Sequence, residues 1–439
     1  MAAVLVTATS GAAGAATFYV DAGNPRAADT NDGTEAKPWR TVQHAAHRAQ
    51  AGDTVIVKPG RYDEKVTVRA SGTEDRPVVL RAVPSREALV KGFVLEGDHI
   101  AIEGFEVTDD TKEANGIFAG ESHRKTARTG SRILDNYIHD LDGTGIFTGE
   151  KAVVRGNRIQ RVFRGAWVNG GTLFEDNEID TLVPRLTEKD GETVATKTQY
   201  TFFAGSDITF RGNYFHGAPE EWLIKGMGVC FFASWDAWII GSSSHILIEN
   251  NRCFNATHAS EPMAVVHKQS VGITYRNNLF VNTVYVGVMP KAFQNVTVEN
   301  NTFINCGAYP VWLQGPQCEN AVVRNNLIAY VGRDRVVKAF GWKPPESGIR
   351  MDTQGARGVC NYNLLAGCLS RGYGPNDIKG EPQFVDPSNG DFRLKPGSPG
   401  IDAGVAIEAV KTDLRGVARP QGAAYDIGAY EFDSERDAK

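Results

Sequence analysis

Basic and acidic side chains gather in one stretch of the chain that interrupts an otherwise regular sequence repeat. His267 and Lys268 are adjacent, and Lys225, Glu221 and Asp236 lie in the long segment before them. Abstraction of a proton next to a carboxylate needs a general base and a cation that neutralises the developing negative charge. We expect His267 and Lys268 to fill these roles, with Lys225 in the nearest long loop.

The same stretch offers the groups for a different reaction. Hydrolysis of a glycosidic bond uses two carboxyl groups, one as acid and one as base or nucleophile. Glu221 and Asp236 are the candidate pair, since the adjacent Glu220 would point to the other side of an extended segment. Calcium, held by Asp and Glu oxygens, is the candidate cofactor. Its ligands stay unassigned, because the acidic residues of 188–192 do not form an EF-hand loop.

Alternating residues in the predicted strands indicate a binding surface for a sugar polymer. One alternate set fits a buried core: Phe147, Val168, Phe202, Cys230, Val265, Val288 and Leu313. The other set points outward and includes aromatic side chains, which are unusual on an open sheet unless something covers them. A saccharide can stack on such rings, or inserted loops can cover them. The candidate substrate-binding residues are Trp167, Asn169, Phe203, Phe231, Lys291, Trp312 and Gln314.

A repeated unit must position these residues, and the chain repeats itself from residue 133 to residue 328. Each unit has a β-branched or aromatic residue, two further residues, Asn, one residue and an apolar residue, as in Ile133-Leu-Asp-Asn-Tyr-Ile138. Most intervals are roughly 20 to 27 residues, the period of a solenoid coil. The repeated asparagines are Asn136, Asn157, Asn177, Asn213, Asn251, Asn278, Asn301 and Asn326.

The repeat predicts an all-β fold, a right-handed parallel β-helix. Apolar residues alternate with polar ones around each Asn, as in short strands with one buried face. Asn tolerates left-handed backbone angles, so we expect one Asn per coil at a shared corner, each side-chain amide bonded to the next coil. The apolar partners should stack inside the coils: Ile138, Ile159, Ile179, Phe215, Cys253, Phe280, Phe303 and Ile328.

The start of the chain predicts export and a capped solenoid. Residues 1–16 are small and apolar and look like the end of a secretory signal, so we expect a signal-peptide remnant. The protein would then be secreted, periplasmic or held at the cell surface. Residues 17–60 should form the first strands and a capping helix that closes the open end of the core. The helix should bury one face, formed by Val42, Ala45, Ala46 and Ala49.

The rest of the chain divides into a long solenoid and a tail. Residues 61–370 should form the β-helix, and residues 371–439 a C-terminal β-helix tail. Polar or irregular insertions at 181–200, 216–245 and 331–356 should become loops on one face, often the face that binds.

Composition limits the partners. The formal net charge of -5 argues against a general nucleic-acid binder. No segment apart from the apolar start approaches the length and apolarity needed to span a membrane. The six cysteines form no C-x-x-C pattern, so buried thiols are expected and a structural zinc is not. We expect a monomer that binds a polysaccharide or oligosaccharide.

Both ends of the chain resemble secreted β-helix proteins of the pectate-lyase-like superfamily. At the start the likeness extends to family 9 polysaccharide lyases and covers Tyr19-Val-Asp21, Asn31-Asp-Gly-Thr34, Lys37-Pro-Trp-Arg-Thr41 and Ala51-Gly-Asp-Thr-Val55. At the end it covers Phe384-Val-Asp386, Gly390-Asp-Phe-Arg-Leu394 and Asp426-Ile-Gly-Ala-Tyr-Glu431. The clustered aspartate motif of a family 9 calcium site is not found. The resemblance therefore implies the fold, which hosts several reactions.

We expect an extracellular carbohydrate-active enzyme, first a polysaccharide lyase that cleaves a uronate-containing glycan by β-elimination. A glycoside hydrolase or a uronate epimerase on the same scaffold is the second possibility. The third is a glycan-binding surface protein without catalytic activity.

Overall fold

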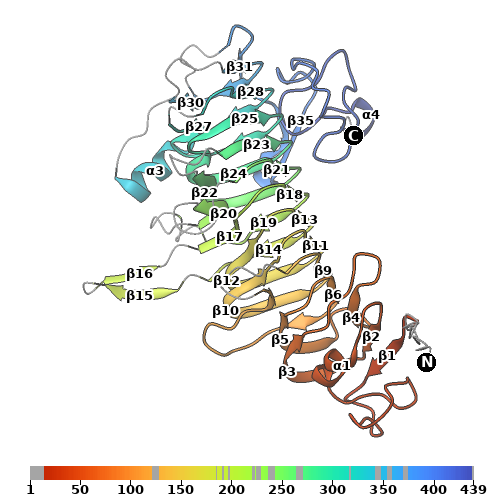
Figure 1. The fold of residues 1–439 in the computed structure, drawn as a ribbon. Helices are drawn as coiled ribbons and strands as arrows, with labels where there is room; N and C mark the ends of the chain where they lie inside the picture. Colours follow the sequence, from red (N-terminus) through yellow and green to blue (C-terminus); the bar gives the residue numbers. More distant parts are fainter. Residues whose placement is uncertain are drawn as a thin grey trace, which may run out of the picture.

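The computed structural model describes residues 14–120, 128–183, 185–189, 192–195, 198–219, 223, 229–235, 243–263, 270–315, 318–341, 348–352, 358–368 and 374–437. Its strands are mostly parallel and stack coil upon coil along one axis, from the N-terminal end to the C-terminal end (Figure 1). The predicted parallel β-helix is confirmed. Within the described residues, no helix is both long and apolar enough to cross a membrane.

A short helix closes the N-terminal end, as predicted. Helix α1 (Val42–Arg48) starts after Thr41, whose side chain accepts a hydrogen bond from the backbone nitrogen of His44 at 3.2 Å. This N-cap satisfies one of the donors that a helix start leaves open. The helix buries Val42, Ala45 and Ala46 against the first coils.

The first sheet holds one strand from each coil. Its order follows the sequence, so every neighbour is the next coil along the axis. The strands are β1 (Thr17–Val20), β2 (Thr54–Val57), β4 (Val78–Ala82), β6 (Ile100–Glu103), β9 (Arg132–Leu134), β11 (Val153–Arg155), β13 (Leu173–Glu175), β18 (Ile208–Arg211), β21 (Ile246–Glu249), β23 (Ser270–Arg276), β25 (Phe293–Glu299), β28 (Val322–Arg324) and β31 (Val359–Asn361).

Two further sheets share several long strands that bend between them. The first part of each shared strand lies in the second sheet and the last part in the third: β3 (Gly60–Val68), β5 (Ala88–Leu95), β10 (Tyr137–Phe147), β12 (Arg158–Val168), β22 (Arg252–Met263) and β24 (Leu279–Val288). The second sheet also holds β7 (Glu106–Val107), β14 (Glu178–Asp180), β19 (Tyr214–His216), β26 (Thr302–Ile304), β29 (Leu327–Ala329), β32 (Leu364–Ala366) and β33 (Ile378–Lys379). The third also holds β8 (Ile117–Ala119), β17 (Thr198–Phe203), β20 (Val229–Trp235), β27 (Tyr309–Leu313) and β30 (Ile349–Met351).

The predicted asparagine ladder lies at the corner between the first and second sheets. Asn136 donates from its backbone nitrogen and from Nδ2 to Oδ1 of Asn157, both at 3.0 Å. All eight predicted residues repeat this contact, which confirms the ladder. It continues through Asn363, whose backbone nitrogen donates to Asp377 Oδ1 at 2.8 Å. The members are buried, so each amide replaces the hydrogen bonds that water would otherwise supply.

One detail of the predicted corner was wrong. The left-handed residue is the one before the ladder asparagine, as at Asp135, with φ 56°, and Asn250, with φ 57°. The ladder asparagine itself continues the chain into the next strand. Asp, Asn and Gly tolerate the left-handed region best, which explains their frequency at this preceding position.

The stacked interior agrees with the predicted apolar column. Ile138, Cys253 and Phe303 are fully buried, as are the other predicted members of the column. The six cysteines are free, and four of them are buried, Cys230, Cys253, Cys306 and Cys318.

The C-terminal tail covers the later part of the second sheet. It contains β34 (Phe384–Asp386) and β35 (Asp391–Leu394), and it ends in α4 (Ser434–Asp437). Phe384, Phe392 and Ile427 form one apolar cluster with second-sheet residues such as Leu327. The burial of this apolar surface from water stabilises the docked tail.

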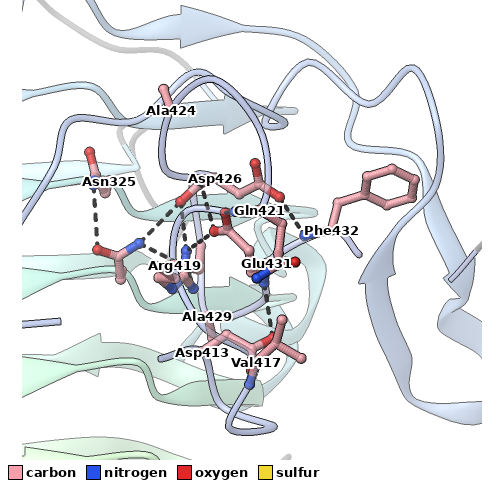
Figure 2. Close-up of polar contacts among 12 residues, drawn as sticks. Asn325, Asp413, Val417, Arg419, Gln421, Ala424, Asp426, Ala429, Glu431 and Phe432 are labelled. Carbon is pink, nitrogen blue, oxygen red and sulfur yellow. Dashed lines mark hydrogen bonds and ion pairs between the residues drawn. The ribbon is translucent and has the colours of Figure 1, made fainter. Parts of the chain in front are cut away.

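A buried polar network holds the tail together. Figure 2 shows Arg419 against Glu431 and against the backbone of Asp426, with Nη1 2.8 Å from Glu431 Oε2 and 3.0 Å from the Asp426 carbonyl oxygen. Asn325, the left-handed residue before a ladder asparagine, donates to the Val405 carbonyl oxygen at 2.7 Å. The tail therefore docks on the same corner that carries the ladder.

Candidate functional site

The long connections border one sheet. From β9 onward, two residues separate each first-sheet strand from the second-sheet strand that follows, such as Asp135 and Asn136. The longer connections instead lead into or out of the third sheet. One carries the hairpin of β15 (Leu186–Lys189) and β16 (Glu192–Ala195), and another carries helix α3 (Arg333–Phe340) (Figure 1). The insertions predicted from sequence thus all join the third sheet, and two of them supply its strands β20 and β30.

Aromatic rings form a continuous stack on the outward surface of the third sheet. Phe118 lies 4.6 Å from Phe147, Phe147 lies 5.3 Å from Trp167, and Trp167 lies 4.4 Å from Phe202, between ring centroids. The rings come from successive coils. Trp167 points outward as predicted, but Phe147 and Phe202 do so too, and their predicted places in the core were wrong. The two middle rings of the stack, Phe147 and Trp167, each pack against a ring on both sides. We therefore assign the stack a structural role first, that of holding the sheet surface in place.

Phe203 and Phe231 do not lie on this surface, and the prediction that their side chains point outward was wrong. Both side chains are fully buried. Phe203 pairs in register with Val168, a core residue, and the Phe231 ring lies 5.1 Å from that of Tyr200 inside the coil. Two aromatic residues in succession hide which member faces inward at 202–203, and at 231–232 both side chains are fully buried.

Arginine side chains lie over the aromatic stack near its border with the second sheet. The Arg164 guanidinium lies 5.4 Å from the Trp167 ring centroid and 5.8 Å from that of Phe202. Arg185, just before β15, lies 4.5 Å from the Phe163 ring and pairs with Asp142, with 3.1 Å between Nε and Oδ1. Cation–π contacts of this kind are stronger when the cation has lost part of its hydration shell. Sequence reasoning missed both arginines because no repeat marks them.

A second aromatic cluster lies on the later coils. Trp312 lies in one apolar cluster with Tyr309 and with Val336 of α3, and only 8% of it is exposed. Trp312 Nε1 donates to Asp352 Oδ2 at 2.8 Å, and Arg350 Nη1 donates to the Tyr309 hydroxyl at 2.7 Å. The prediction that Trp312 faces outward is correct, and the alternative that inserted elements cover the aromatics holds here.

The remaining predicted binding residues lie at the border with the first sheet. Lys291 and Gln314 are neighbours in a parallel bridge, and both are half-buried. The backbone nitrogen of Asn169 donates to Thr148 Oγ1 at 2.9 Å on the preceding coil. The structure therefore brings Lys291 and Gln314 together and leaves Asn169 several coils away.

The five predicted catalytic residues, His267, Lys268, Lys225, Glu221 and Asp236, lie outside the described residues. Their chain segments connect strands of the third sheet to its neighbours. In the described part of the third sheet, His258 is the only strand histidine, and its ring centroid lies 5.2 Å from that of Tyr285. It is a half-buried candidate base that the sequence reasoning did not name.

A metal centre has no visible set of ligands in the described part of the chain. Among those residues, no group of three or more His, Cys, Asp or Glu side chains could hold a metal ion. The acidic side chains of the 188–192 segment are not described. Calcium binding by loop carboxylates therefore stays a prediction.

Two family models match the sequence of the chain. Residues 18–196 match the family model described as "Pel9A-like, right handed beta helix region", and residues 169–327 and 202–372 match "Right handed beta helix region". The chain is a right-handed β-helix protein. These matches agree with the resemblance seen at its N-terminal end.

Individual relatives of this β-helix protein are distant. An uncharacterized protein of Bacillus subtilis, YwoF, is 30% identical over 139 residues, which span 28% of this chain and 29% of the relative. The solved structure of XylC with xylose has a TM-score of 0.56 at 11% identity and covers 95% of this chain and 98% of its own. Pectate lyase Pel9A has a TM-score of 0.42 at 14% identity and covers 97% and 98%. The likeness to XylC supports the fold alone.

Proposed function

We propose that this β-helix protein is a polysaccharide lyase that cleaves an acidic glycan by β-elimination on the outward surface of the third sheet. One observation carries the proposal: guanidinium groups lie over aromatic rings at two places on the sheet that the long connections border. Arg164 lies 5.4 Å from the Trp167 ring and Arg350 lies 4.5 Å from the Trp312 ring. Two guanidinium groups held on one surface suit a polymer that carries anionic groups.

The dimensions of the surface also suit a polymer. Trp167 and Trp312 are five coils apart in the register of the third sheet. At the usual strand spacing, five coils span about 24 Å. A ligand that reaches from one arginine–aromatic pair to the other must therefore be extended, which favours an oligosaccharide over a single sugar.

The reaction needs a protein base and a positively charged protein group that act on the same sugar unit. The base removes the proton next to the carboxylate, the electron pair forms a double bond, and the glycosidic oxygen on the neighbouring carbon leaves and takes up a proton. We propose His267 or Lys268 as the base, with His258 as a further candidate. A guanidinium or ammonium group stabilises the negative charge that builds up on the carboxylate.

The family match supports a polysaccharide as the ligand. The matched model over residues 18–196 is named after Pel9A, and the solved protein of that name is a pectate lyase. Export from the cell, expected from the apolar start, fits an external polymer as substrate.

The test is a panel of acidic and neutral polysaccharides incubated with the purified protein. A lyase produces an unsaturated uronate with new ultraviolet absorbance. New reducing ends without that absorbance would instead support a hydrolase that uses Glu221 and Asp236. Exchange of the uronate proton for solvent deuterium without cleavage would support an epimerase, and binding without any of these would support a glycan-binding protein. An added chelator, followed by calcium, tests the proposed loop calcium.

A further inference from the structure

Arg164 carries a positive charge that no acidic group of the described chain neutralises. It lies on β12 opposite Thr144, at the end of the third sheet that borders the second. Its Nε donates to Gln199 Oε1 at 3.0 Å. In the described part of the chain, neither Nη atom has a protein partner, although the guanidinium touches the rings of Phe163, Trp167 and Phe202.

This arrangement is unfavourable for the protein alone. Burial, and then the nearby Arg185 charge, lower the pKa of Arg164 to about 10. A charged side chain that is removed from water usually pairs with a group of opposite charge. Cation–π contacts replace only part of the lost hydration free energy. Strong shifts of this kind, at a surface bordered by long loops, are typical of functional sites.

Other arginines on the outside of the β-helix show what Arg164 lacks. Arg185 pairs with Asp142 at 3.1 Å, and Arg350 pairs with Asp352 at 2.7 Å. Arg161, three residues before Arg164 on the same strand, pairs with Asp140 at 2.5 Å. Among the described residues Arg164 is the exception, and its Nη atoms, which have no protein acceptor there, form the fork that fits a carboxylate.

A second donor beside Arg164 also lacks a partner. Trp167 Nε1 is buried and has no hydrogen-bond acceptor in the described structure. Buried indole N–H groups usually find an acceptor. The two unmatched donors belong to residues in contact, because the Arg164 guanidinium lies on the Trp167 ring.

We propose that Arg164 and Trp167 form a subsite that binds the carboxylate of an acidic sugar unit and sets the preference for charged over neutral glycans. The proposal rests on the proposed function and names its substrate class. The guanidinium receives the carboxylate through its Nη atoms. The Trp167 ring lies against the guanidinium and supports it in this position. The subsite binds and positions the polymer.

The test compares Arg164→Met with Arg161→Met as the matched control on the same strand. Calorimetry measures the binding of a uronate oligosaccharide and of the same oligosaccharide with its carboxyl groups reduced. We expect Arg164→Met to weaken binding of the acidic ligand tenfold or more, with little effect on the neutral ligand. Arg161→Met should bind both as the parent does, and Arg164→Lys should restore part of the affinity.

Thermal unfolding separates binding from a structural role. A subsite arginine without an acidic partner among the described residues should leave the unfolding temperature unchanged or higher when Met replaces it. A lower unfolding temperature together with equal losses for both ligands would make Arg164 a structural residue and overturn the proposal. Competition by inorganic phosphate as strong as by the uronate would show a general anion site and overturn the assignment to a sugar.

The outcome is distinguishable from failure of the lyase proposal. If the parent protein binds the uronate oligosaccharide but cleaves no polysaccharide, and Arg164→Met loses that binding, the lyase proposal is refuted and the subsite is supported. Cleavage of an acidic polymer with unchanged KM and uronate affinity in Arg164→Met would support the lyase and refute the subsite.

Discussion

Asn278 is joined twice to Asn301 on the next coil: its backbone nitrogen and its Nδ2 both donate to Asn301 Oδ1, at 3.0 and 2.9 Å. Asn278 Oδ1 receives the same pair of bonds from Asn251, at 3.0 Å each. One side chain therefore connects three coils in a fully buried corner.

Replacement of Asn278 by Ala should lower the free energy of unfolding by more than about 2 kcal/mol. The change leaves the backbone nitrogen of Asn251 and the carbonyl oxygen of Ile248 without their side-chain partner, and unsatisfied buried groups are destabilising. Denaturant unfolding measures the change. The control is Gln294→Ala on the outward side of β25, which should change the free energy of unfolding by no more than about 0.5 kcal/mol. Equal effects of the two substitutions would contradict this role of the ladder.

Replacement of Arg419 by Met should undock the C-terminal tail. Its side chain is almost fully buried and neutralises Glu431, so its loss leaves a buried carboxylate without its cation. Removing one partner of a buried pair typically destabilises by about 3–5 kcal/mol. Limited proteolysis should then cut the tail at lower protease concentrations than in the parent. Arg436→Met removes an arginine with 70% of its side chain exposed, and it should leave the pattern unchanged.

The stability of the docked tail should fall as the pH rises from about 4 to about 7. Burial, and then the Glu431 charge, raise the pKa of Asp426 from its ordinary value of 3.8 to about 7. The folded state then holds this proton more tightly than the unfolded state, so its contribution is complete below the unfolded pKa and is lost as the pH approaches 7.

Unfolding temperatures of the parent and Asp426→Asn across this range provide the measurement. The variant will be less stable throughout, because both carboxylate oxygens accept backbone hydrogen bonds, from Asp402 and Phe432. The informative quantity is the slope with pH, which should be smaller in the variant. Parallel curves would show that Asp426 does not titrate in this window.

Charged residues on the outside of the first sheet should contribute unequally to stability. Glu299 has 2% of its side chain exposed and pairs with Arg276 at 2.9 Å and with Arg324 at 3.1 Å. Glu299→Gln should destabilise by about 2 kcal/mol, since two arginines lose a shielded partner. Glu103 pairs with Arg81, whose side chain is 47% exposed, so Glu103→Gln should change stability by less than about 1 kcal/mol. Thermal unfolding of both variants distinguishes them.

Much of the fold could be predicted because the ladder leaves a pattern in the sequence. Asn363 was missed because Cys360 stands where the other coils have a β-branched or aromatic residue. Asp377 ends the ladder with a carboxylate and therefore lies outside an asparagine pattern.

The surface of the third sheet was harder to predict, for two physical reasons. Adjacent aromatic residues such as Phe202 and Phe203 remove the alternation that separates inside from outside. Irregular register, as between Ala256 and His258, shifts the alternation along a strand. Arg164 carries no motif, since its significance lies in the lack of an acidic partner within the described part of the chain, which only the folded chain reveals.

The two-residue corner that follows each first-sheet strand from β9 onward restricts how this protein can change. An inserted residue there would break the hydrogen bonds of two coils, whereas the borders of the third sheet already hold connections of many lengths. The corner that fixes the stacking of the coils and the loops that border the third sheet are therefore separate parts of the chain. New surfaces on the third sheet could be engineered by exchanging the border loops between β-helix proteins, with the asparagine corner left untouched as the fixed reference for grafting.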